Sequence, residues 1–112
     1  MDTATATKMF GALAHEHRLA VFRMLVQSGA EGRPAGEIAA ELELLPSTLS
    51  FHLSALEGAG LVRSMRTGRY IRYCMRPEAV CSLLDFLTED CCGGHPEQCG
   101  LAHAASQESG HP

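Results

Sequence analysis

The chain has 112 residues, of which 46% are hydrophobic and 20% charged, and its formal net charge is −4 at pH 7. These values are ordinary for one small soluble domain, and a domain of this size gains stability by dimerising. No apolar run approaches the roughly 18 residues that a membrane span needs, so we expect no membrane contact. The first residues lack the features of a signal peptide, which predicts a cytoplasmic protein.

The charges are unevenly distributed. Residues 1–46 carry four basic and six acidic side chains, and residues 77–112 carry six acidic side chains and no lysine or arginine. Residues 47–76 carry five arginines against one glutamate. A basic block of this kind presents a local surface for phosphate despite the acidic total. A purely solvated face is the alternative.

The first half of the chain predicts three helices, over residues 3–13, 16–27 and 35–43. Gly29 is placed to stop the second helix, and residues 32–34 are expected to form a loop. Apolar side chains recur at helical spacing in each segment and are expected to face the core. They are Ala6, Met9, Phe10, Leu13, Leu19, Phe22, Leu25, Val26, Ile38, Ala39 and Leu42.

The second half predicts a helix, a hairpin and a final helix. Pro46 suits the first position of a helix that runs to Glu57. Over residues 61–65 and 70–75 the hydrophobic pattern changes from helical spacing to a period of two residues. This predicts two strands, joined by a turn that contains a glycine. Pro77 opens the last helix. The residues expected to be buried here are Leu49, Leu53, Leu56, Cys74, Val80, Cys81, Leu83, Leu84 and Leu87.

This order of elements predicts a mainly α fold with a β-hairpin wing, a winged helix-turn-helix. The helix over 46–57 leaves small hydroxyl side chains and one phenylalanine outside, and no acidic residue lies between Pro46 and Leu56. A helix that enters the major groove needs such short polar side chains. Arginines near the hairpin tip can reach phosphates or the minor groove. An ordinary surface helix is the alternative, and His52 is expected to be a hydrogen-bonded structural residue rather than a ligand. The candidate DNA-binding residues are Ser47, Thr48, Ser50, Phe51, Ser54, Arg66 and Arg69.

Residues 47–62, STLSFHLSALEGAGLV, resemble the signature of the ArsR/SmtB family of bacterial metal-responsive repressors, and 68–73 and 13–22 add to this resemblance. The resemblance covers roughly residues 6–92. It implies a homodimer formed by the first and last helices, an operator of double-stranded DNA with two-fold symmetry, and release of that DNA when metal binds. It also places Ser47, Ser50 and Phe51 on DNA-contacting positions, although a polar residue is more usual at position 51.

The five cysteines are an odd number without a secretory signal, which favours metal or redox chemistry over a disulfide framework. One arsenic site of the family would need cysteines on the helix over 36–42, where there are none. The zinc-type site would need histidines on the last helix, where only Asp85 and Asp90 are present. A Cys-Cys-x6-Cys cluster remains, and it resembles an arsenite-responsive branch of the family. Its members are Cys91, Cys92 and Cys99.

Three thiolates with no obligatory fourth ligand suit As(III) as the inducer, and Sb(III) has the same preference. Adjacent cysteines diverge by about 100° on a helix, but at a fraying helix end both can turn toward one ion. Zn²⁺ or Cd²⁺ would prefer a fourth ligand, either His95 or a water. A redox switch through a Cys92–Cys99 disulfide and three incidental thiols are the alternatives.

No enzyme activity is expected, because a reductase thiol needs an anion-binding loop and these thiols follow the acidic pair Glu89-Asp90. The predicted organisation is a DNA-binding and dimerisation domain over 1–92, a cysteine sensor segment over 91–99 and a disordered tail over 100–112. We expect an arsenite-responsive repressor, with a thiol-based redox sensor or a Cd/Zn sensor as the alternative.

Overall fold

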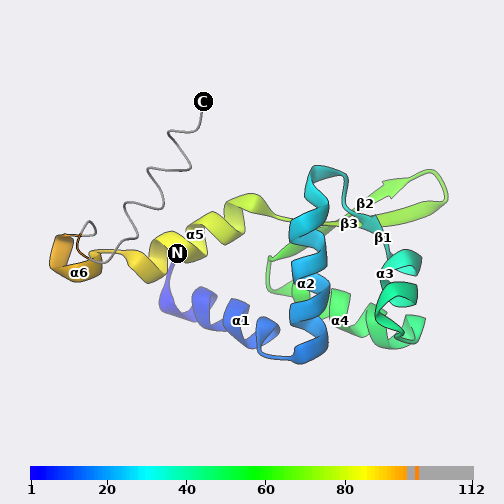
Figure 1. Ribbon diagram of the computed structural model, residues 1–112, viewed down its shortest axis with the longest axis horizontal. Coiled ribbons are helices and arrows are strands. Elements are labelled where there is room, and N and C mark those ends of the chain that lie inside the picture. The colour runs from blue at the N-terminus through cyan, green and yellow to red at the C-terminus, as the bar shows by residue number, and fades with distance from the viewer. Residues whose placement is uncertain (96–97, 99–112) are drawn as a thin grey trace.

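The computed structural model describes residues 1–95 and residue 98. The helices that pack around the core are followed by a hairpin and then by two further helices, as Figure 1 shows. The elements are α1 (Thr3–Leu13), α2 (Glu16–Ser28), the 3-10 turn η1 (Gly29–Glu31), β1 (Arg33–Pro34), α3 (Ala35–Leu42), α4 (Pro46–Gly58), β2 (Val62–Thr67), β3 (Tyr70–Met75), α5 (Pro77–Thr88) and α6 (Cys91–Gly94). The predicted winged helix-turn-helix is confirmed.

Backbone chemistry explains where the helices end. Gly29 follows α2 with φ +70°, and Gly60 follows α4 with φ +81°, conformations that glycine adopts without strain. Glu43 ends α3 in the left-handed region, and its N–H donates to the carbonyls of Ala39 and Ala40. The chain therefore reverses tightly between α3 and α4, and Pro46 opens α4 at a position that needs no N–H donor.

The sheet has three antiparallel strands in the order β1-β3-β2. The prediction of a loop over 32–34 is wrong, because Arg33 and Pro34 pair with Tyr73 and Arg72 of β3. Gly32 makes this pairing possible: it has φ +63°, and a Cβ at this position would lie 2.1 Å from the Tyr73 carbonyl oxygen. Only a residue without a side chain allows this approach of the two backbones.

The hairpin is longer than predicted. Thr67 pairs with Tyr70, so the loop consists of Gly68 and Arg69 alone. Arg66, which the sequence placed in the turn, belongs to β2 and pairs with Ile71. Figure 1 shows the hairpin projecting from the body of the domain as a wing.

The buried core contains residues from each of the first four helices, from the hairpin and, on α5, from Leu83 alone. Cys74 is buried as predicted. The expected inward positions Leu19 and Val26 are exposed, because α2 turns the face of Val21, Phe22 and Leu25 to the core instead. On α1 and α5, Leu13 and Val80 are partly buried and pack against the core as expected, whereas three other expected core positions are exposed: Phe10, Leu84 and Leu87.

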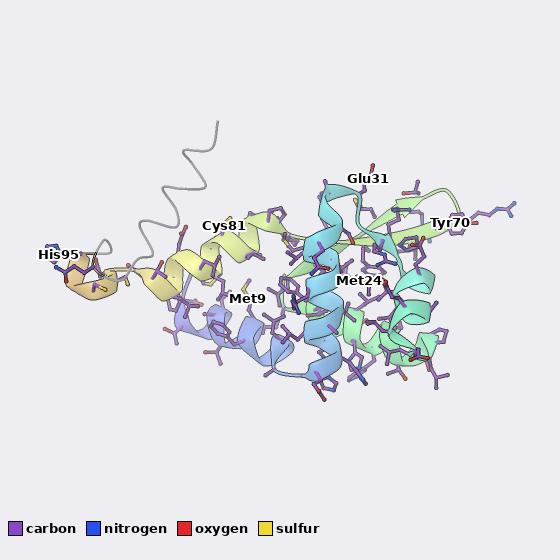
Figure 2. The ribbon with its side chains drawn as sticks, in the orientation of Figure 1. Met9, Met24, Glu31, Tyr70, Cys81 and His95 are labelled. Atoms are coloured by element: carbon purple, nitrogen blue, oxygen red, sulfur yellow. The ribbon has the colours of Figure 1, made fainter. Side chains whose placement is uncertain are left out.

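Helix α5 packs against the body by one narrow face. Leu83 is its single buried residue, and Met1 at the start of the chain shares a groove with Ser82, Asp85 and Phe86. The expectation that Cys81 lies in the core is wrong: this thiol, labelled on α5 in Figure 2, is exposed. Within the described residues, no helix has the length and apolar character required to cross a membrane.

Candidate DNA-binding surface and thiol segment

Helix α4 separates two kinds of side chain. Leu49, His52, Leu53 and Leu56 are buried against the other helices. The predicted DNA-binding side chains lie on the remaining surface: Thr48 is partly buried, and the exposed ones are Ser47, Ser50, Phe51 and Ser54. Phe51 is 65% exposed, a large apolar surface that the chain itself leaves uncovered. The helix thus presents small hydroxyl groups around one aromatic ring, the surface that close approach to base edges requires.

An arginine that the sequence did not single out supports this surface. Arg18 of α2 places its guanidinium carbon 5.4 Å from the centroid of the Phe51 ring, a cation–π distance. Its Nε donates a hydrogen bond of 3.2 Å to Nδ1 of His52. The expected role of His52 as a buried, hydrogen-bonded residue is therefore confirmed. Arg18 lies 34 residues away in sequence, so no local pattern indicates the contact.

Three histidines lie close together where the start of α2 meets α4: His15, His17 and His52. The ring centroids of His15 and His52 are 4.7 Å apart, and those of His17 and His52 are 5.8 Å apart. Burial lowers the pKa of the His52 imidazole, and the neighbouring charges of His15, Arg18 and His17 lower it further. The imidazole of His52 is therefore held in its neutral form at neutral pH.

The arginines of the wing divide into two groups. Arg63 donates from Nε to the Cys74 sulfur, and Arg72 donates to the backbone carbonyls of Glu31 and Gly32. Arg66 and Arg69 are exposed, and they form no ion pair with any residue that the structure describes. Arg66 and Arg69 thus present their guanidinium groups to solvent, whereas Arg72 helps to hold η1 against β3.

The thiol segment follows α5 after a sharp change of direction. Asp90 and Cys92 have φ values of +56° and +54°, so the short helix α6 is irregular at Cys92. Such left-handed residues cost roughly 1 kcal/mol each and indicate a locally strained turn. As a consequence the Sγ atoms of Cys91 and Cys92 lie 3.7 Å apart, although adjacent residues on a regular helix would diverge.

Two of the three predicted thiol ligands are therefore close together. Cys91 is partly buried and Cys92 is exposed, while His95, the alternative fourth ligand, is exposed at the end of α6 (Figure 2). Cys99 and the predicted tail over 100–112 lie outside the described residues.

Comparison with known proteins agrees with the helix-turn-helix geometry. A family model described as a helix-turn-helix domain matches residues 13–64. The HTH-type transcriptional regulator YgaV of Escherichia coli is 33% identical over 87 residues, which cover 78% of this chain and 86% of YgaV. The transcriptional activator HlyU of Vibrio cholerae is 30% identical over 86 residues, which cover 77% of each protein.

Solved structures extend the comparison. An ArsR-like transcriptional regulator from Rhodococcus sp. RHA1 has a TM-score of 0.70 at 27% identity, covering 94% of this chain and 92% of that one. The homodimeric winged helix-turn-helix domain of Mb0332 from Mycobacterium bovis has a TM-score of 0.63 at 28% identity, covering 78% and 81%.

A crystal structure described as a possible transcriptional regulator for arsenical resistance has a TM-score of 0.62 at 26% identity, and the match covers 71% of this chain and 79% of that one. The recognition helix, the wing and the relatives agree on one assignment, a regulator that binds DNA and not an enzyme. The chain belongs to the ArsR family of helix-turn-helix transcriptional regulators.

Proposed function

We propose that this regulator is a homodimeric repressor that binds operator DNA of two-fold symmetry and releases it when As(III) binds Cys91, Cys92 and Cys99. The observation that carries the proposal is the distance of 3.7 Å between the Cys91 and Cys92 sulfurs. Two sulfur ligands bound at about 2.3 Å to one tetrahedral ion lie about 3.8 Å apart, and the narrower bond angles of a pyramidal ion require a slightly shorter separation, so a small side-chain rotation lets this pair share one ion.

The choice of ion follows from the donor set. Thiolates select soft ions, and three thiolates without a fixed fourth ligand suit the pyramidal coordination of As(III), with Sb(III) as an equivalent. A Zn²⁺ or Cd²⁺ ion would recruit His95 or water as a fourth ligand. The structural relative described as a possible regulator for arsenical resistance adds support for the arsenic assignment.

The proposed operator contacts come from α4 and the wing. Ser47, Ser50 and Ser54 supply hydroxyl groups for phosphates and base edges, and the ring of Phe51 faces thymine methyl groups. Thr48 borders this surface. On the wing, the candidates for phosphate contact are Arg66 and Arg69.

Dimerisation would place two such surfaces on one duplex. Phe10 on α1 and Leu84 and Leu87 on α5 are large exposed apolar side chains that a second copy can cover. The homodimeric relative from Mycobacterium bovis supports this arrangement. Two recognition helices about 34–36 Å apart would then enter successive major grooves.

The proposed coupling runs along α5. The cysteine segment follows α5 directly, so an ion that joins three thiolates reshapes the end of a helix in the proposed dimer interface. A hundredfold loss of operator affinity requires about 2.8 kcal/mol of coupling free energy, and DNA must weaken arsenite binding by the same factor.

The proposal is tested by titrating the reduced, full-length protein with arsenite and counting the thiols consumed per ion. We expect one ion and three thiols per protomer, and loss of this binding in Cys92→Ser. Cys81→Ser is the matched control, because Cys81 is also an exposed thiol but lies on α5, outside the segment. Equal arsenite binding by Cys92→Ser and the wild type would refute the assignment.

The same assay separates the alternatives. A redox sensor would lose two thiols to a mild oxidant and release DNA without arsenite. A Cd/Zn sensor would bind those ions more tightly than arsenite and would lose affinity in His95→Ala.

A further inference from the structure

We propose that His15, His17 and His52 form a second metal site, a three-histidine site for a divalent transition-metal ion such as Zn²⁺. One potential ligand atom from each residue lies within 4.8 Å of the other two. His15 and His17 come from the start of α2, and His52 comes from α4. An ion here would tie the start of α2 to the recognition helix, independently of the cysteine segment.

The geometry requires a modest contraction. Nitrogen ligands at about 2.0–2.1 Å from a tetrahedral zinc ion lie about 3.4 Å apart, so ligand atoms that now lie within 4.8 Å of one another must approach by at most about 1.4 Å. His52 is only 4% exposed and is fixed by the core. His15 and His17 are exposed, so their rings can rotate toward it without disturbing packed side chains, although His15 then gives up the hydrogen bond that its Nδ1 accepts from the His17 N–H. The buried histidine thus provides a fixed ligand, and the two exposed ones complete the set.

The ionisation state of the cluster favours a ligand role. An imidazole binds a metal through a neutral ring nitrogen, and the proton competes for the same lone pair. Burial and the positive groups around it lower the pKa of His52 and keep its ring neutral. Its Nδ1 already accepts a hydrogen bond from Arg18, which identifies that nitrogen as the one with an available lone pair.

Metal binding at His52 must displace Arg18, whichever ring nitrogen is used. An ion at Nδ1 takes the lone pair that now accepts the Arg18 N–H. An ion at Nε2 moves the ring proton to Nδ1, which then becomes a donor facing another donor. The guanidinium of Arg18 is therefore a competitor of the ion, and its release changes the cation–π contact with Phe51 on the DNA-binding surface.

The test measures Zn²⁺ binding by competition with a chromophoric chelator at a pH of about 7.5, where free imidazoles are mostly neutral. It uses the full chain with all three segment thiols replaced, Cys91→Ser, Cys92→Ser and Cys99→Ser, so that thiolates of the proposed arsenite site cannot bind the ion. We expect one Zn²⁺ per protomer. Absence of Zn²⁺ binding in this experiment would not bear on the proposed arsenite site, because the two experiments depend on different residues.

Ligand variants then identify the site. His15→Asn retains a side-chain acceptor for the N-cap contact that His15 makes with the His17 N–H, and His17→Gln changes an exposed side chain. Each is expected to weaken Zn²⁺ binding at least tenfold with an unchanged thermal midpoint. His95→Gln is the control histidine and should bind as the parent does. Absence of binding by the parent, or unchanged binding in both ligand variants, would overturn the proposal.

Arg18→Met tests the competition in the opposite direction. Removing the guanidinium leaves the Nδ1 lone pair of His52 without its present donor, so Zn²⁺ affinity should rise several-fold. Co²⁺ bound at the site should show the visible absorption of nitrogen coordination without thiolate charge-transfer bands. Unchanged or weaker Zn²⁺ affinity in Arg18→Met would refute the displacement of Arg18.

Discussion

At the scale of single residues, Gly32 determines how the wing is attached to the domain. Its φ is +63°, and a Cβ at this position would lie 2.1 Å from the Tyr73 carbonyl oxygen, which leaves no room for a side chain. The neighbouring carbonyls of Glu31 and Gly32 also accept hydrogen bonds from Arg72. The absence of a side chain at this one position therefore allows η1 and β1 to pack against β3.

Gly32→Ala is expected to lower the free energy of unfolding by about 2–3 kcal/mol, because both the left-handed conformation and the close backbone contact penalise a Cβ. Chemical denaturation monitored by circular dichroism measures this change. The control is Gly36→Ala in α3, where a Cβ meets nothing within 4 Å and alanine favours the helix, so stability should rise by about 0.5–1 kcal/mol. Equal effects of the two substitutions would contradict the role given to Gly32.

Residue-scale contacts were the least predictable from the sequence. The spacing of leucines and hydroxyl residues along α4 predicted which of its side chains face outward, because the helical period determines which residues share a face. The contact between Arg18 and His52 and the approach of His15 depend on how α2 crosses α4, and no local pattern encodes that crossing.

At the scale of elements, α4 combines a buried face with an exposed face that is proposed to contact DNA. Leu53 is 1% exposed and its neighbour Phe51 is 65% exposed, so two large apolar residues two positions apart have different roles. On the wing, Arg66 in β2 and Arg69 in the two-residue loop are the further residues proposed to contact DNA.

Phe51→Ala is expected to weaken operator binding at least tenfold while changing the free energy of unfolding by less than about 1 kcal/mol, since it removes mostly exposed surface, a cation–π contact with Arg18 and one ring contact with His52. Leu53→Ala should instead cost about 2–5 kcal/mol of stability, because it creates a cavity in the core. Fluorescence anisotropy and denaturation measure the two effects. A large loss of stability in Phe51→Ala would show that the ring has a structural role.

The double substitution Arg66→Ala and Arg69→Ala is expected to make the negative slope of log affinity against log salt concentration shallower. Its magnitude should fall by about 2 for each protomer's half-site, since each phosphate contact contributes about one. Binding should weaken on specific and non-specific duplexes alike. Arg76→Ala is the control, because Arg76 is already paired with Glu78 at 3.0 Å. An unchanged salt slope in the wing variant would exclude wing contacts with phosphate.

The sequence predicted the elements well where a period or a breaker residue defines them, as in α2 with Gly29 and α4 with Pro46. It failed at β1, because a two-residue strand has no period and forms only through the contact of Gly32 with β3. The hairpin was placed correctly but too short, since the turn is fixed by the pairing of Thr67 with Tyr70.

At the scale of the whole molecule, α1 and α5 leave an apolar surface uncovered. The period of α5 identified Leu84 and Leu87 as members of an apolar stripe, yet both are more than half exposed in the single chain. Periodicity reveals which face of a helix is apolar, but it does not reveal whether the same chain or a second copy covers that face. This explains why the expected core was larger than the observed one.

Leu84→Glu combined with Leu87→Glu is expected to yield a monomer in sedimentation velocity experiments and to weaken operator binding more than tenfold, because two buried charges at a dimer interface are strongly unfavourable. Val26→Glu introduces one charge at a comparably exposed apolar residue on α2 and should remain dimeric. A dimer that persists in the double variant would place the interface elsewhere.

The most direct measurement is operator affinity with and without arsenite, using a duplex selected by the reduced protein from a random pool and read by fluorescence anisotropy. We predict that saturating arsenite weakens binding by the wild type about a hundredfold, equivalent to about 2.8 kcal/mol, and leaves Cys92→Ser bound. Release of the duplex from Cys92→Ser at the same arsenite concentration as from the wild type would contradict sensing by Cys91, Cys92 and Cys99.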